Sequence, residues 1–498
     1  MNRTLKNGWP VMVLMAMILV MLPVAAGAVV VGDTGSLSGG MRTFNLTAQE
    51  GRIIMGDGET AYIWGYASTT NVNAVCPAGN CVQYPGPTLI VNQGETVVVN
   101  LTNLIPTLPG NTPQNTSIVF PGQSVTPSGG VAGLLTREAA PLGGAVSYTF
   151  VAGNPGTYTY YSGTNPGLQN EMGLFGALII RPNNVGTANC TLPVNTTAPN
   201  QGYAYCFPGA YYDREYLFVT SEVDAAMHRL VEFGQMSQVD DTKRHPTAWF
   251  VNGRNFPDTM SQNYAGWLPT QPYSGLPVMH PLESVLIRLV SGGRDLHPYH
   301  THGQNHSLIA RDGRILKSTS AVISSDMPIS DYTTTTVAGE TVDAIWGPWT
   351  GFKLGWDIFG PSGSHSCNTS AAGCTPATCP AQGLIAFLGL GSAQWAPGFD
   401  PRTGEWCGDF NKAIPVSLPA PSRTIFGPFY GGTPYIGIPG ELPPIDPNTG
   451  NFHSYQNPVG GLQFMWHSHA ERELTTNNIF IGGMASLALI VPYTVPIP

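Results

Sequence analysis

Charged side chains are scarce in this sequence. Aspartate, glutamate, lysine and arginine make up 10% of the 498 residues, against about a quarter in a typical soluble domain. The formal net charge is −9 and no basic stripe runs along the chain, so we expect no nucleic-acid partner. Intrinsic disorder is excluded as well, because disordered chains combine few apolar residues with high charge, whereas 42% of this chain is hydrophobic.

Helical periodicity is also missing. No long segment repeats its apolar residues every 3.6 positions, and the glycines follow no strict period, which excludes a collagen helix. Glycine (60) and proline (44) nevertheless exceed a fifth of the 498 residues. A turn-rich chain with enough apolar residues to fill a core predicts an all-β protein of many short strands, and the length suggests two or three domains.

Only one apolar run resembles a membrane segment. It extends from Val11 to Val24, follows Arg3 and Lys6, and precedes the small-residue triplet Ala26-Gly27-Ala28. This pattern predicts a secretory signal, residues 1–28, rather than a retained membrane anchor, because the run is short and no second apolar stretch of about 20 residues follows. We therefore expect a secreted, periplasmic or cell-surface protein without a transmembrane segment once the signal is removed.

The eight cysteines suit an oxidising compartment. Cys76 and Cys81 bracket a short turn, and Cys190 and Cys206 bracket a linker rich in proline and asparagine. The other four form one later cluster, which a zinc site or disulfides could explain; their irregular spacing favours disulfides and leaves the pairing open. These four are Cys367, Cys374, Cys379 and Cys407.

Two β-rich blocks are predicted. The first block covers residues 41–182, a linker covers 183–213, and the second block covers 214–498 with a disulfide-stapled insertion at about 355–460. Alternating or continuous apolar runs predict strands at Thr88–Val91, Glu95–Asn100, Ser147–Val151, Gly156–Tyr161, Leu174–Ile180, Glu215–Thr220, Ala248–Val251, Val285–Val290 and Ala485–Val491. The Asn-Gln-Gly between the first two of these strands predicts a hairpin.

Histidine provides the chemical signal. The chain has only 11 histidines, yet His297, His300 and His302 stand within one short segment, with His306 close behind, and a second pair lies at 467 and 469. A His-x-His on a strand directs both imidazoles to one face. Two such pairs on neighbouring strands would present four imidazoles to one point, a ligand set that suits copper, zinc, iron or nickel.

Several segments resemble multicopper oxidases. The similarity is carried by Pro85–Asn103, Pro155–Tyr160, Gly173–Ile180 and Phe250–Gly253, by His297–Gly303, which is close to the copper motif His-Pro-x-His-x-His-Gly, and by Trp466–His469, which lies where the family has its last motif, His-Cys-His. The two-block layout is similar to that of two-domain members such as nitrite reductases and small laccases. The resemblance implies two cupredoxin-like Greek-key β-sandwich domains, bound copper, and a homo-oligomer such as a trimer or a larger assembly.

The departures from the family pattern are specific. Ser468 stands where the family has the thiolate ligand of its type 1 copper, Glu473 stands where it has the second type 1 histidine, and Met484 is displaced, while His297 is retained. A blue copper site needs two histidines and a cysteine, so we expect none. In the first block the family's histidine motifs fall on Ser117–Gly122 and on Tyr161-Ser162-Gly163, which contain no histidine.

The retained motifs imply one copper, or at most two. The expected metal ligands are His297, His300, His302, His467 and His469, with His306, Glu471 and Glu473 as further candidates. Zinc would also accept these histidines.

Three functions stay open on this basis. The protein is a copper-dependent oxidoreductase without a type 1 site, in which Glu473 or Glu471 either donates a proton or lies on a solvated turn. Alternatively it is a catalytically inactive scaffold, serving as a cell-surface or filament-forming subunit. In the third case a neighbouring subunit completes the copper cluster. The sequence does not define the substrate, whether a small molecule or a metal ion.

Overall fold

A computed structural model describes residues 30–69, 82–183, 190, 202–280, 283–322, 324–348, 435–437, 461–491 and 495–497. The predicted signal, the Cys76 and Cys81 pair and the four clustered cysteines lie outside these described residues, as does almost all of the predicted insertion. Within the described ranges, no helix is both long and apolar enough to span a membrane.

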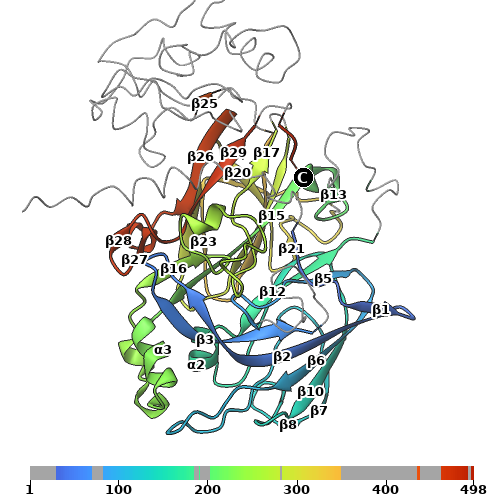
Figure 1. The fold of residues 1–498 in the computed structure, drawn as a ribbon. Helices are drawn as coiled ribbons and strands as arrows, with labels where there is room; N and C mark the ends of the chain where they lie inside the picture. The colour runs from blue at the N-terminus through green and yellow to red at the C-terminus, as the bar shows by residue number, and fades with distance from the viewer. Residues whose placement is uncertain are drawn as a thin grey trace, which may run out of the picture.

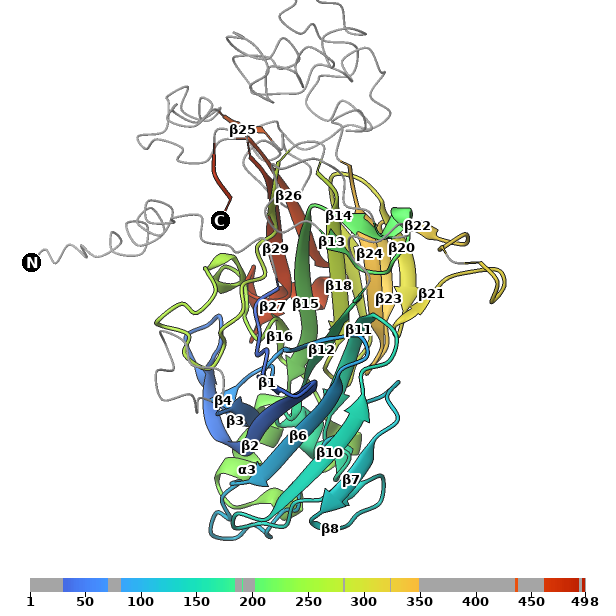
Figure 2. The ribbon, with the colours of Figure 1, turned by 90° about the vertical axis from the view of Figure 1, so that its right-hand side faces the viewer.

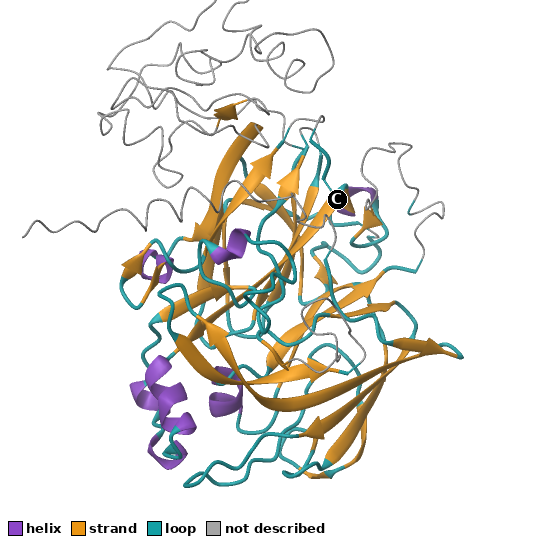
Figure 3. Ribbon diagram, in the orientation of Figure 1, coloured by secondary structure: helices purple, strands orange, loops and turns teal. Residues whose placement is uncertain are grey.

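The described chain is mostly β, with a few short helices (Figure 3). In the first block, drawn in blue to teal in Figure 1, a seven-stranded sheet has the order β4-β3-β2-β6-β10-β7, with β1 paired to β2, and a three-stranded sheet has the order β11-β12-β5. The elements are β1 (Ser36–Ser38), β2 (Met41–Ile54), β3 (Thr60–Ser68), β4 (Val82–Gln83), β5 (Leu89–Asn92), β6 (Thr96–Asn103), β7 (Thr126–Gly129), β8 (Val131–Ala132), β9 (Arg137–Glu138), β10 (Ala145–Val151), β11 (Gly156–Tyr161), α2 (Pro166–Glu171) and β12 (Phe175–Arg181).

Strict alternation explains the strands of the large sheet. Along β6, Val97, Val99 and Leu101 are buried while the residues between them are half-buried. They share a core with aromatic residues from neighbouring elements, including Phe120 and Tyr148. One face of the sheet is therefore apolar, as the period-two pattern predicts.

The hairpin predicted between β5 and β6 is wrong. β5 pairs in parallel with β12, Leu89 opposite Leu178, whereas β6 pairs with β2 and β10 in the other sheet. The connection is held to both sheets, because the Gln93 amide donates to Arg181 and the Gly94 amide donates to Ala152. The Asn-Gln-Gly segment thus carries the chain from one sheet to the other, a distinction that local turn chemistry does not encode.

The second block, green to red in Figure 1, contains two larger sheets. The nine-stranded sheet has the order β21-β20-β24-β18-β15-β16-β27-β28, with β22 paired to β20; the six-stranded sheet has the order β17-β29-β26-β19-β23, with β25 paired to β26. The strands of this block are β15 (Arg214–Val223), β16 (Ala248–Val251), β17 (Val278–Met279), β18 (Val285–Ser291), β19 (His297–Thr301), β20 (His306–Arg311), β21 (Arg314–Ile315), β22 (Ile329–Asp331), β23 (Thr333–Thr336), β24 (Thr341–Trp346), β25 (Tyr435–Gly437), β26 (Gly461–Ser468), β27 (Thr475–Thr476), β28 (Ile479–Phe480) and β29 (Ala485–Ile490). Within the predicted linker, β13 (Gly202–Tyr203) pairs with β14 (Tyr211–Tyr212) as a separate two-stranded sheet.

Helical elements of the second block are short. They are α3 (Ala225–Glu232), which Asp224 caps through its side chain, and the 3-10 turns η2 (Met236–Gln238), η3 (Asp241–Lys243), η4 (Asp258–Met260) and η6 (Glu471–Leu474). A further 3-10 turn, η1 (Pro208–Ala210), lies in the predicted linker. The turn η6 follows β26 and leads into β27. Its position matters for the site described below.

The two blocks pack directly against each other. One apolar core combines Phe175 and Ile179 of the first block with Val219, Phe250 and Val290 of the second. Figure 2 shows β11 and β12 beside β15 and β18. Burial of apolar surface from both blocks therefore sets their relative position.

Charged groups are buried at the same boundary. Arg288 lies 2.9 Å from Glu215 and donates to the hydroxyl of Thr157 in β11, and Thr157 also donates to Asp343. Because each buried charge has an opposite charge beside it, this cluster avoids the cost of an unpaired ion.

Cys190 and Cys206, which bracket part of the predicted linker, form a disulfide. The predicted strands at 88–91, 95–100, 147–151, 156–161, 174–180, 215–220, 248–251, 285–290 and 485–491 all overlap strands of the structure. The division into two cupredoxin-like domains at the stated boundaries stays a prediction.

Candidate metal centre

Two neighbouring strands position the histidines. β19 and β26 pair antiparallel, and His300 stands directly opposite His467 in the register. His302 and His469 follow just beyond the ends of the two strands. The two His-x-His pairs therefore lie at neighbouring strands, the condition under which their imidazoles could meet.

Three of the imidazoles converge. His300, His302 and His467 each offer a ring nitrogen, and these three atoms lie within 4.8 Å of one another. The Nε2 atoms of His302 and His467 are 3.2 Å apart. The ring of His469 is exposed and lies 4.8 Å from the ring of His300 and 5.7 Å from that of His467. A metal ion could be held by the first three rings, with the fourth at the solvent side.

Polar neighbours orient two of these rings. Nδ1 of His467 lies 2.6 Å from the carbonyl oxygen of Ser468, so this nitrogen carries the proton and Nε2 has the free lone pair. Nδ1 of His300 lies 2.7 Å from the hydroxyl of Thr333 on β23. Such outer hydrogen bonds fix the tautomer and the direction of metal-binding imidazoles.

Hydrogen bonds to the backbone of His302 also fix the position of the turn that carries this residue. The indole of Trp466 donates to the carbonyl of His302 at 3.2 Å, and the His302 amide donates to Met465. Gly303 follows with φ 99°, and a Cβ there would lie 2.9 Å from the ring of Trp346. Glycine is required after His302 for both reasons.

Burial keeps the three rings neutral. Desolvation, followed by the charges of neighbouring histidines, lowers the pKa of His300 to about 4 and the pKa of His302 to about 3. Burial also lowers the pKa of His467 to about 4. At neutral pH the group is therefore in the unprotonated form that binds metal.

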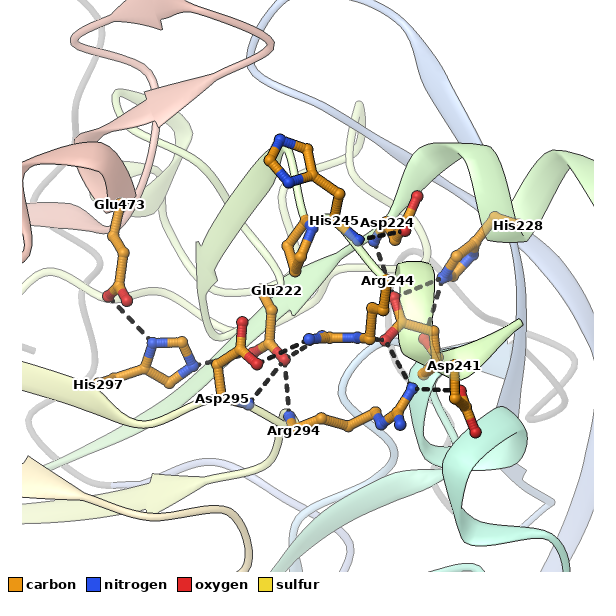
Figure 4. A network of polar contacts seen from close by, with 12 residues as sticks. Glu222, Asp224, His228, Asp241, Arg244, His245, Arg294, Asp295, His297 and Glu473 are labelled. Carbon is orange, nitrogen blue, oxygen red and sulfur yellow. Dashed lines mark hydrogen bonds and ion pairs between the residues drawn. The ribbon is translucent and has the colours of Figure 1, made fainter. Parts of the chain in front are cut away.

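His297 does not join this group. Its Nδ1 lies 3.0 Å from Oε2 of Glu473 and its Nε2 lies 2.9 Å from Oε2 of Glu222, so both ring nitrogens face carboxylates (Figure 4). Burial alone would lower the pKa of His297, but the hydrogen bonds to Glu222 and Glu473 outweigh it and raise the pKa to about 9. A protonated imidazole offers no lone pair to a metal.

The type 1 copper implied by the family resemblance does not fit these residues. Ser468 donates from its hydroxyl to the same Oε2 of Glu473, at 2.6 Å, that faces His297. Met484 is buried and meets this turn through its backbone, donating to Glu473 and accepting from Ser468. These residues supply no thiolate, and both ring nitrogens of His297 face carboxylates. The arrangement is therefore a polar network rather than a copper site.

The remaining candidate residues lie outside the group. His306 is buried, with its two ring nitrogens beside the hydroxyls of Thr301 and Thr334 at 2.9 and 2.7 Å. Glu471 is exposed in η6. Glu222 was missed by sequence reasoning; it follows the apolar run Tyr216–Val219 of β15, a strand whose residues are all buried.

In the first block, small polar side chains occupy the positions of the missing histidines. The Ser117 hydroxyl pairs with that of Thr164 and accepts from the Gly163 amide, while Ser162 donates to Gln169. These groups satisfy one another and provide no imidazole ligand.

Comparison with known proteins shows that part of the chain is similar to multicopper oxidases. The family model described as multicopper oxidase matches residues 70–185. A 126-residue region is 33% identical to L-ascorbate oxidase from Cucurbita pepo var. melopepo, covering 25% of this chain and 21% of that protein. The similarity to multicopper oxidases is thus established for this part of the chain.

Other similarities within the multicopper oxidase superfamily are local or distant. Multicopper oxidase MCE from Talaromyces pinophilus is 39% identical over 103 residues, which cover 20% of this chain and 15% of that protein. The aligned part of the chain thus spans about a fifth of the curated relatives it matches. The structure of a blue copper oxidase from Nitrosomonas europaea aligns with 90% of this chain and 86% of its own, with a TM-score of 0.47 and 16% identity.

Proposed function

We propose that this protein is a multicopper-oxidase-like copper protein that holds one copper ion at His300, His302 and His467. The observation that carries the proposal is the convergence of these three ring nitrogens within 4.8 Å. The match of residues 70–185 to the multicopper oxidase model favours copper over zinc as the ion. His469 is the fourth ligand in the proposal, because its ring adjoins that of His300.

The proposed activity is that of a copper-dependent oxidoreductase without a type 1 centre. Bound copper would supply a redox centre and a Lewis acid. The chain's own contribution is to keep the three imidazoles neutral by burial and to orient them through Thr333 and the Ser468 carbonyl. Solvent reaches the group on the side of His469, which is exposed, so a substrate would approach there.

Glu473 receives no role in proton transfer in this proposal. Its Oε2 faces His297 and Ser468, and the residue is buried. This geometry supports a structural assignment for the glutamate that the sequence had offered as a proton donor.

Export and self-association are further parts of the proposal. The Cys190–Cys206 disulfide supports an oxidising compartment. Leu296, Ile329 and Tyr332 are exposed apolar side chains, and Tyr332 lies edge-on to His300. Such side chains favour a homo-oligomer, which sedimentation of the purified protein would test.

Elemental analysis and electron paramagnetic resonance of copper-loaded protein test the function. We expect about one copper per chain with a colourless, type 2-like signal. A His300→Ala, His467→Ala double variant should lose both the metal and the signal. Equal copper contents in the two proteins would contradict the site, and the absence of stoichiometric metal from the unsubstituted protein would favour the inactive scaffold.

A further inference from the structure

One carboxylate oxygen joins three elements of the second block. Oε2 of Glu473, in η6, accepts from Nδ1 of His297 on β19 at 3.0 Å and from the hydroxyl of Ser468 on β26 at 2.6 Å. All three residues are buried. Two groups that the family resemblance assigns to a metal are here bound to a side-chain anion of the same chain.

The other ring nitrogen of His297 also faces a carboxylate. Nε2 faces Oε2 of Glu222 at 2.9 Å, and both side chains are fully buried. The other oxygen of Glu222 accepts from the amides of Arg294 and Asp295 at 2.7 and 3.0 Å. An imidazole between two carboxylates donates from both nitrogens and therefore carries a positive charge.

The chain of charges continues into the first block. Arg244 forms ion pairs with Glu222 and with Glu171, which ends helix α2 of the first block. Glu171 also accepts from the amide of Asp224 at 2.8 Å. Figure 4 shows Glu473, His297, Glu222 and Arg244 in succession.

We propose that Glu473, His297, Glu222, Arg244 and Glu171 form a metal-free ionic strut, in which the Glu473 carboxylate replaces a type 1 copper as the group that holds His297. The strut connects the C-terminal turn η6, the β19 strand and the first block. His297 is then not a metal ligand, and among the described residues of the second block the metal-binding histidines are those of the His300 group.

The buried charges of the strut are compatible with a stable fold only when all of its members are present. Buried charges lose their hydration, and the loss is offset when each has an opposite charge and hydrogen bonds. Removing one member leaves its partner charged and buried, which is far more costly than removing a neutral hydrogen-bonded residue. The members of the strut should therefore depend on one another for their contribution to folding.

A double-mutant cycle measures that dependence. We expect His297→Gln and Glu473→Gln each to raise the unfolding equilibrium constant of the metal-free protein by on the order of 100-fold, and the double variant to raise it little more than one single variant does. His306→Gln is the control, because its ring bonds threonine hydroxyls; its effect should add to that of Glu473→Gln. Additive effects of His297→Gln and Glu473→Gln would overturn the strut.

Copper spectroscopy tests the replacement itself. Ser468→Cys supplies the missing thiolate, yet we expect this variant to stay colourless with copper because Glu473 still holds His297. Ser468→Cys combined with Glu473→His frees Nδ1 and should develop the intense thiolate-to-copper absorption of a blue site. A blue colour in the single variant shows that His297 was available to metal and overturns the proposal.

The tests of the strut do not depend on whether the His300 group binds copper. If the unsubstituted protein binds no copper, the proposed function fails, while the double-mutant cycle and the colour of the Ser468→Cys variant still decide the strut. If His297→Gln does not fold, the colour of the Ser468→Cys single variant is sufficient, because this substitution leaves every charged member in place.

Discussion

The Nε2 atoms of His302 and His467 lie 3.2 Å apart, although 165 positions separate the two residues in the sequence. The antiparallel register of β19 and β26 brings them together, with Thr301 opposite Trp466 and His300 opposite His467. Two neutral imidazoles at this distance share one proton between them, and a metal ion can take the place of that proton.

Substitution of His302 should remove the metal. We expect His302→Ala to weaken copper binding by at least 100-fold, since one of three converging ligands is lost. His306→Ala is the matched control, because His306 is a buried histidine of the same segment that lies outside the group. Calorimetric titration with Cu(II) provides the measurement, and equal weakening by the two substitutions would count against the assignment.

Copper should be retained in mild acid. Protons compete with metal for imidazole, and an ordinary histidine has a pKa of about 6.5. Because burial lowers the pKa values of His300, His302 and His467 to about 4, 3 and 4, competition begins only at lower pH. Equilibrium dialysis should show copper held at about pH 5.5 and released as the pH falls toward 4; release centred near pH 6.5 would contradict the burial effect.

Thr333 should tune the affinity of the site. Its hydroxyl lies 2.7 Å from Nδ1 of His300, and loss of such an outer partner typically costs 10–100-fold in metal affinity. We expect Thr333→Val to weaken copper binding in that range. Thr335→Val, at an exposed position of the same strand, should leave the dissociation constant unchanged, and a loss of equal size in both variants would point to a disturbed strand instead.

Stability should fall in alkali through His297. The pKa of this ring is raised to about 9 in the folded protein, against about 6.5 in an unfolded chain. The protonated ring therefore stabilises the fold fully below about pH 6.5, and this contribution of about 3 kcal/mol is lost as the pH rises through 9. Urea unfolding at several pH values should show the loss in the unsubstituted protein and its absence in His297→Gln; parallel pH profiles would refute the assignment.

Gly313 should be intolerant of a side chain. It adopts φ 67°, and a Cβ there would lie 2.2 Å from the ring of Tyr158 in the first block. We expect Gly313→Ala to lower the free energy of unfolding by about 2–3 kcal/mol through overpacking. Gly143→Ala is the control, since Gly143 also has a positive φ, 91°, but no atom within 4 Å of the added carbon; its cost should be about 1 kcal/mol. Thermal unfolding distinguishes the two.

Strands were predictable where a local pattern is sufficient. The alternation in Ser147–Val151 and the β-branched and aromatic run Gly156–Tyr161 lie in β10 and β11. The partner of a strand was less predictable, as the wrong β5–β6 hairpin shows. Pairing depends on apolar surface contributed by distant segments, and a three-residue connection is compatible with a turn within one sheet or a passage between two.

The candidate metal centre was likewise predictable from the sequence only in part. Period-two geometry was enough to predict that each His-x-His pair is directed to one side, and that the two pairs would meet if their strands were neighbours. The fate of His297 could not be predicted, because it depends on Glu222, 75 positions earlier. A motif that matches a family locally does not show which carboxylate the fold brings to each nitrogen.

The sequence by itself determined the β-rich class, the superfamily resemblance, and the loss of the cysteine at Ser468, since these depend on residue identity and short-range periodicity. Only the tertiary structure decided that His300, His302 and His467 converge while His297 is held by Glu222 and Glu473. The physical reason is that metal coordination and buried ion pairing both require atoms within a few ångströms, and in this protein those atoms come from strands that are far apart in the chain.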